Sequence, residues 1–201
     1  MMVLLSPKFD IENEIQILNQ LFIAGLECYH LRKPDRTRQE YVDLLKEIDP
    51  KYHNRIVIHQ FHELTNDFNL KGIHFEEQQR RNYIETPTRY FKDLKLFGKT
   101  ISSTFHELND LVDSDFEFDY HFLWPLFSLG KQPNSEVNRI DVNHVDKGII
   151  AVGDLDKKTF YDVFTLGYRG IAILETVWQS KDPLTSFTDL KTVYDTIIIK
   201  P

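Results

Sequence analysis

The chain has 201 residues, of which 41% are hydrophobic and 27% charged, and its formal net charge is −7. These values are typical of one well-buried domain. No stretch approaches the roughly 20 apolar residues of a membrane span. The net negative charge gives no reason to expect nucleic acid or an anionic membrane as partner. The single cysteine, Cys28, excludes an internal disulfide and suits a reducing cytoplasm, where we expect a buried small side chain.

Short apolar runs alternate with amphipathic stretches along the chain. Segments 10–25, 37–49 and 157–167 have helical patterns, and Gly25 and Gly167 end the first and third of them as probable helix stops. Such alternation predicts a parallel sheet with helices outside, and eight runs predict a closed α/β (β/α)8 TIM barrel, one domain over residues 1–201. The expected strands are 2–6, 27–32, 55–60, 71–76, 99–105, 118–124, 148–153 and 170–174.

Segment 76–98 is long, charged and irregular. One interpretation is a mobile loop over the mouth of the barrel. The other is a solvated helix followed by a linker, because charge runs usually mark solvated faces. The pattern alone leaves both open.

In a barrel of this kind, chemistry gathers where strands end and loops begin. Arg32 is a candidate for binding an anion, although a buried salt bridge would explain it as well. His30, His59 and His74 could hold zinc, but their spacing lacks a compact ligand motif, so we expect hydrogen-bonded core histidines and no metal site. No G-x-S-x-G elbow, Walker loop or G-x-G-x-x-G is present. The strand ends carry His30, Arg32, His59, Gln60, His74, Glu76, Glu77, Ser103, Thr104, His106, Trp124, Gly153, Asp154 and Glu175.

Seven motifs follow one another in chain order from about residue 2 to Trp178: YHLRK, NRIVIHQ, LKGIHFEEQQ, STFHELNDL, FDYHFLWPLF, IIAVGDL and GYRGIAIL. Each is weak alone, but together they resemble the landmarks of the thiamine phosphate synthase and TenI family. The resemblance implies a (β/α)8 barrel and a role in thiamine biosynthesis. The synthase couples a pyrimidine pyrophosphate to a thiazole phosphate with magnesium. The TenI branch tautomerises a thiazole carboxylate phosphate without magnesium.

The resemblance also implies roles for the residues that would hold pyrophosphate and magnesium. At the family's Gln-Arg-Lys set for the pyrophosphate stand His30, Arg32 and Pro34. His59 and Gln60 stand for an Asn-Asp pair, and Gln79 stands for a magnesium-binding aspartate. Because Mg²⁺ prefers charged oxygen ligands, the amides of Gln60 and Gln79 remove most of its attraction, and we expect no cofactor where the family uses magnesium.

The resemblance places a phosphate loop after the seventh and eighth strands. Gly153 keeps one glycine of this loop, whereas Asp154 and Glu175 replace a glycine and a serine. A carboxylate repels a phosphate about 4 Å away by about 1 kcal/mol even in water, so both acids argue against the usual phosphate ligand; Asp154 also suits a helix cap. Lys131 corresponds to a lysine of the loop after the sixth strand. His106 corresponds to the proposed proton shuttle of TenI-like tautomerases, although it also lies where a helix is expected to begin.

Two classes of function remain open. The first is an enzyme of thiamine biosynthesis, with synthase or TenI chemistry and with His106 and Arg32 as catalytic residues. The second is a non-catalytic, repurposed barrel that binds another ligand or a protein partner. We expect a cytoplasmic protein with a small-molecule substrate of thiazole or pyrimidine type, and self-association into a homo-oligomer is left open. The expected substrate-binding residues are His30, Arg32, His59, Gln60, Ser103, Thr104, Lys131, Gly153, Asp154 and Glu175.

Overall fold

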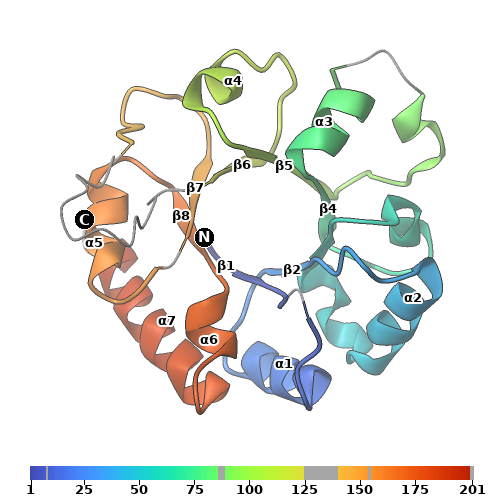
Figure 1. The fold of residues 1–201 in the computed structure, drawn as a ribbon, viewed down its shortest axis with the longest axis horizontal. Coiled ribbons are helices and arrows are strands. Elements are labelled where there is room, and N and C mark those ends of the chain that lie inside the picture. Colours follow the sequence, from blue (N-terminus) through green and yellow to red (C-terminus); the bar gives the residue numbers. More distant parts are fainter. Residues whose placement is uncertain (8, 86–88, 125–139, 154, 200–201) are drawn as a thin grey trace.

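A closed barrel of eight parallel strands forms the centre of the molecule (Figure 1). The computed structural model describes residues 1–7, 9–85, 89–124, 140–153 and 155–199. Each strand pairs with the next along the chain, and β8 pairs with β1 to close the barrel. Every strand lies inside one of the eight predicted runs, so the predicted (β/α)8 fold is confirmed. The strands are β1 (Met2–Leu5), β2 (Tyr29–Leu31), β3 (Ile56–Ile58), β4 (Gly72–Phe75), β5 (Thr100–Phe105), β6 (Tyr120–Leu123), β7 (Ile149–Val152) and β8 (Gly170–Ile173).

Helices surround the barrel on its outside (Figure 1). The three predicted helical segments are confirmed as α1, α2 and α5. Gly25 and Gly167 follow α1 and α5 with φ of 97° and 94°, the left-handed conformation that glycine adopts most readily beyond a helix end. The helices are α1 (Glu14–Ile23), α2 (Arg38–Glu47), α3 (Glu77–Tyr83), α4 (Leu108–Val112), α5 (Thr159–Thr165), α6 (Glu175–Trp178) and α7 (Pro183–Ile199), with 3-10 turns η1 (Pro50–Arg55), η2 (His62–Asn66) and η3 (Tyr90–Asp93).

The strands are apolar because both of their faces are buried. Along β1, Met2 and Leu4 pack in the larger cluster with the helices, whereas Val3 and Leu5 belong to a smaller cluster inside the barrel. This is the alternation expected of a strand. The remaining members of the inner cluster are Cys28, Val57, Tyr120, Phe122, Ile150, Val152 and Ala172.

The inside of the barrel is polar on one side. His30 from β2 and His74 from β4 are fully buried, and both rings contact Phe122 of the inner cluster. Ser102 from β5 is also fully buried and contacts the His74 ring. β2, β4 and β5 therefore carry buried hydrogen-bonding groups, and the Tyr120 hydroxyl of β6 bonds to His30, while the rest of the inner cluster is apolar.

Segment 76–98 begins with a helix and not with a loop. Its first part is α3, and η3 follows within it; residues 86–88 lie outside the described part of the chain. Glu77, Gln78 and Arg81 of α3 border a cavity at the end of the barrel. The helical interpretation is thus confirmed for α3, and the segment also reaches the mouth of the barrel.

Cys28 is buried without a disulfide partner, as the sequence predicts. Burial raises the pKa of its thiol to about 12, so it stays protonated and unreactive at neutral pH. None of the helices in the described residues combines the length and apolar character needed to cross a membrane.

We expect Gly72→Ala to destabilise the barrel. A Cβ at Gly72 would lie 2.0 Å from the backbone oxygen of Thr100, so β4 and β5 would have to separate. Overpacking of this kind costs about 1–3 kcal/mol, measurable as a shift of the denaturation midpoint. Gly148→Ala is the matched control, because its Cβ would meet nothing closer than 3.5 Å. Equal stability of the two variants would contradict the close strand approach.

Candidate functional site

A cavity of about 580 Å³ opens at the carboxyl ends of the strands, where barrel chemistry is expected. One part of its wall is apolar and includes the ring of Phe122 and the half-exposed ring of Trp124. The opposite part carries charged side chains from α3 and from the loops after β2, β4 and β5. The lining residues are Leu5, Ser6, Arg32, His59, Glu76, Glu77, Gln78, Arg81, Thr104, His106, Phe122, Trp124, Val152 and Leu174.

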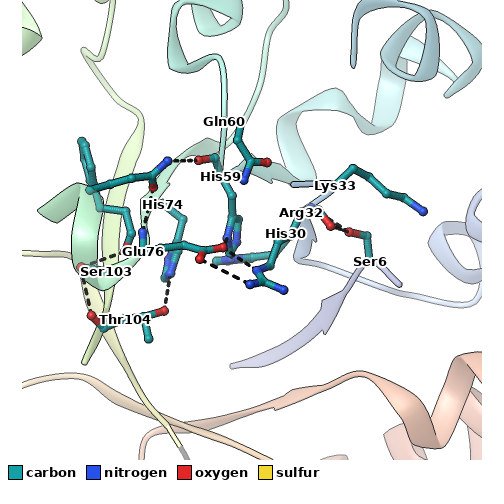
Figure 2. A network of polar contacts seen from close by, with 12 residues as sticks. Ser6, His30, Arg32, Lys33, His59, Gln60, His74, Glu76, Ser103 and Thr104 are labelled. Atoms are coloured by element: carbon teal, nitrogen blue, oxygen red, sulfur yellow. Dashed lines mark hydrogen bonds and ion pairs between the residues drawn. The ribbon is translucent and has the colours of Figure 1, made fainter. Parts of the chain in front are cut away.

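The first charged pair on this wall joins Arg32 to Glu76 (Figure 2). Arg32 Nε donates to Glu76 Oε1, and Nη2 lies 3.4 Å from Oε2, so the guanidinium fork faces both carboxylate oxygens. Glu76 is the N-cap residue of α3, which fixes its position above the end of β4. Contact with His59 and with Arg32 lowers the pKa of Glu76 to about 2. The Glu76 carboxylate is therefore ionised at neutral pH and forms an ion pair with the Arg32 guanidinium.

A second group of charges centres on Glu77. Its Oε2 contacts His106 Nδ1, and its Oε1 accepts from Arg81, whose Nη2 also lies 2.8 Å from Asp110. These contacts lower the pKa of Glu77 against the opposing effect of burial. The imidazole of His106 is half-exposed and stands on the cavity wall beside a carboxylate. Such a pair can accept and return a proton.

Three buried imidazoles lie at and beneath the floor of the cavity (Figure 2). His30 Nδ1 is 3.0 Å from His59 Nε2, and His30 Nε2 is 2.8 Å from the Tyr120 hydroxyl. His74 bonds through Nδ1 to Ser102 Oγ and through Nε2 to Thr104 Oγ1, both at 2.8 Å. Burial lowers the pKa of all three rings, most strongly for His30 and His74, so they are neutral at pH 7.

Among the predicted site residues that the structure describes, four line the cavity: Arg32, His59, Thr104 and His106. His30 lies below its floor. Ser103 points elsewhere, since its hydroxyl donates to the Phe75 carbonyl at 2.9 Å. Glu175 begins α6 as an exposed residue, and neither it nor Gly153 is among the described residues of the wall. The predicted residues Lys131 and Asp154 lie outside the described part of the chain.

The residues at the expected magnesium positions do not fit that ion. Gln60 Oε1 accepts from the Tyr41 hydroxyl. The amide of Gln79 is used at both ends, accepting from the Glu76 backbone N–H at 3.0 Å and donating to the His59 carbonyl at 3.1 Å. Neutral amides held in this way offer no charged oxygen to a hard cation.

The lysine missing from the pyrophosphate set is not supplied by its neighbour. Lys33 precedes Pro34, but its side chain is buried and points away from the histidines (Figure 2). Its Nζ donates to Glu14 at 2.6 Å and to the Phe9 carbonyl at 3.2 Å. Lys33 is therefore part of a buried ion pair under α1.

Sequence reasoning noted Glu76, Glu77 and Trp124 as strand-end residues without assigning them to the site, and it missed Arg81. Their positions directly after β4 and β6 were the available signal. Arg81 carried no such signal, because it is one of several charged residues in its segment. The side of the helix on which it lies depends on where α3 begins.

No family model matches the chain, but it is similar over most of its length to several thiamine-phosphate synthases. It is similar to thiamine-phosphate synthase of Histophilus somni (strain 129Pt), 24% identical over 186 residues that cover 84% of this chain and 81% of that protein. It is similar to that of Dictyoglomus thermophilum (strain ATCC 35947 / DSM 3960 / H-6-12), 23% identical over 178 residues that cover 84% and 77%. In fold it is similar to thiamine phosphate pyrophosphorylase from Bacteroides thetaiotaomicron, with a TM-score of 0.77, 23% identity and coverage of 96% and 97%.

We expect the double variant Glu76→Gln, Glu77→Gln to bind inorganic pyrophosphate at least about tenfold more tightly than the parent. The variant removes two negative charges from the cavity wall and frees Arg32 and His106 from their carboxylate partners. A relief of about 1.4 kcal/mol of repulsion corresponds to a tenfold change in affinity. Calorimetry at low salt measures the difference. Glu107→Gln is the control, because it removes an exposed charge at the N-cap of α4 that does not line the cavity. An equal gain in the control would indicate a net-charge effect only.

Proposed function

We propose that this chain, which is similar to thiamine-phosphate synthases over most of its length, is a thiamine-biosynthesis protein that binds the thiazole or pyrimidine ring of a thiamine precursor in the mouth cavity. The ligand is recognised mainly through its ring. Magnesium-dependent coupling of the two precursors is not part of the proposal, because the residues at the metal positions do not fit.

The observation that carries this proposal is the division of the cavity wall. Phe122, Trp124 and Leu174 form an apolar side against which a flat heterocycle can pack. On the other side, Arg32 is matched by Glu76, and Glu77 is shared by His106 and Arg81. Matched charges supply hydrogen-bonding groups for ring substituents but little net attraction for an anion. The wall therefore suits a heteroaromatic ring better than a pyrophosphate.

We expect the thiazole precursor to bind with and without its phosphate at affinities within about threefold of each other. Among the described residues of the cavity wall a phosphate meets no unpaired cation, so it adds little favourable energy. Calorimetry with thiamine phosphate, thiazole phosphate and the dephosphorylated thiazole measures this difference in affinity.

Trp124→Ala should weaken ring binding about three- to tenfold, since a stacked aromatic pair contributes about 0.5–1.5 kcal/mol.

The control for this variant is Phe97→Ala, which removes a fully exposed aromatic ring outside the cavity wall. Fluorescence gives a second readout, because Trp124 lies at the mouth while Trp178 is buried and donates to the Leu5 carbonyl. Binding that requires both phosphate and Mg²⁺ would contradict the proposal. Failure of all three ligands to bind would instead support a repurposed barrel with another ligand or a protein partner.

A second candidate, a TenI-like tautomerase, is favoured by the position of His106. The ring stands on the cavity wall, and Glu77 holds its Nδ1. Nε2 is then the atom that would take a proton from a bound thiazole carboxylate and return it at another ring position. This exchange balances without a metal or redox partner.

If tautomerisation is the activity, His106→Gln should lower kcat for the thiazole carboxylate phosphate by about 10²-fold or more and leave KM little changed. NMR observation of the two tautomers without added metal follows the reaction. His144→Gln, at an exposed histidine outside the cavity wall, is the control. Equal rates in the parent and in His106→Gln would exclude His106 as the proton carrier.

A further inference from the structure

Three of the buried histidines each bring one nitrogen close to those of the other two inside the barrel. His30, His59 and His74 come from β2, the end of β3 and β4, and one ligand atom from each lies within 4.8 Å of the other two. The binding of a heterocycle in the mouth cavity does not use this cluster, because His30 and His74 lie below the cavity floor. Three polar rings in a barrel interior therefore call for a separate explanation.

Two of the rings are hydrogen-bonded outside the cluster at one nitrogen, and the third, His59, has a carboxylate within ion-pair distance of Nδ1 that forms no hydrogen bond with it. His59 Nδ1 lies 3.5 Å from the Glu76 carboxylate, His30 Nε2 lies 2.8 Å from the Tyr120 hydroxyl, and His74 Nδ1 lies 2.8 Å from Ser102 Oγ. Metal-binding histidines are commonly oriented in this way, with the outer N–H donated to an oxygen and the inner nitrogen left to bind the ion.

The inner nitrogens of His30 and His59 show why a cation fits. Without a cation, one proton between His30 Nδ1 and His59 Nε2, which are 3.0 Å apart, joins the two rings in a hydrogen bond. In the tautomers with both outer nitrogens protonated, these two lone pairs face each other. That arrangement is repulsive unless a proton or a cation lies between them. Two nitrogen ligands of one tetrahedral ion are about 3.3 Å apart when the bonds are 2.0–2.1 Å, so the observed spacing is already close.

We propose that His30, His59 and His74 form a site for one divalent transition-metal ion of the zinc type beneath the floor of the mouth cavity. Imidazole nitrogens select such ions over Mg²⁺, which prefers oxygen. The His74 ring now stacks on His59 with centroids 4.3 Å apart, so it turns out of this stack to present Nε2, exchanging its bond to Thr104 for one to the metal. Because His59, Glu76 and Thr104 line the cavity, the bound ion adjoins the ligand space.

Untagged full-length protein, stripped with a chelator and dialysed, tests the site. We expect it to take up one Zn²⁺ per chain in calorimetry, and Co²⁺ to give the visible absorption of a tetrahedral site. His30→Gln and His74→Gln should each weaken Zn²⁺ binding about 100-fold or more. Glu76→Gln, which removes the charge facing His59 Nδ1 together with the ion pair to Arg32, should weaken it about 10- to 100-fold.

His62→Gln is the matched control, because His62 is equally buried and its Nε2 bonds to the His74 carbonyl without joining the cluster. Zn²⁺ binding should be unchanged in this variant. Failure of the parent to bind one Zn²⁺, an octahedral Co²⁺ spectrum, or equal loss of binding in His62→Gln would each overturn the site. Should the cluster variants not fold, histidine-selective ¹⁵N NMR of the parent decides, since Zn²⁺ must shift the nitrogen resonances of three histidines. None of these readouts depends on the proposed ligand or activity.

Discussion

The carboxylate of Glu76 determines how the mouth of the barrel is arranged. It lies directly after β4 at the N-cap of α3, contacts Arg32 beyond β2 and faces His59 beyond β3. Three neighbouring strand ends are thus joined through one side chain. Glu76 and Gln79 also form a capping box at the start of α3, and Glu77 and Arg81 of this helix line the cavity wall.

The fold was predictable because it depends on signals that are local in the sequence. Strands buried on both faces must be apolar, so runs such as IVI in β3 and IIAV in β7 can be recognised as strands from the sequence. Glycines in the left-handed conformation ended α1 and α5 where the pattern placed them. Segment 76–98 was ambiguous because its helix is short and charged, and the helix packs on the barrel through Arg80, which lies over the Phe105 ring, instead of through an apolar stripe.

The site was only partly predictable, because a position at a strand end does not tell whether the side chain points into the cavity. It also does not tell which charged side chain lies next to it. Ser103 and Thr104 are neighbours, yet alternation turns Thr104 to the cavity and Ser103 away from it. The histidine cluster depends on register across strands: His30 pairs beside Val57, and Ile58 beside Ile73, which brings His59 next to His74 one layer higher. The spacing of these histidines along the chain does not predict that their rings lie together. The pairing of Arg32 with Glu76 likewise spans 44 residues.

The same carboxylate accounts for both unusual features of the mouth. Arg32 presents its fork to Glu76 much as it would to a phosphate, so the chain supplies its own anion where the family resemblance implies a pyrophosphate. An incoming anion would have to displace a carboxylate held by the protein itself, whereas a neutral ring meets no such competitor. On its other side, Glu76 faces His59 Nδ1 and favours the tautomer whose Nε2 lone pair points into the buried cluster. One acid after β4 thus competes with an anion for Arg32 and, in the proposed metal site, faces the outer nitrogen of a ligand.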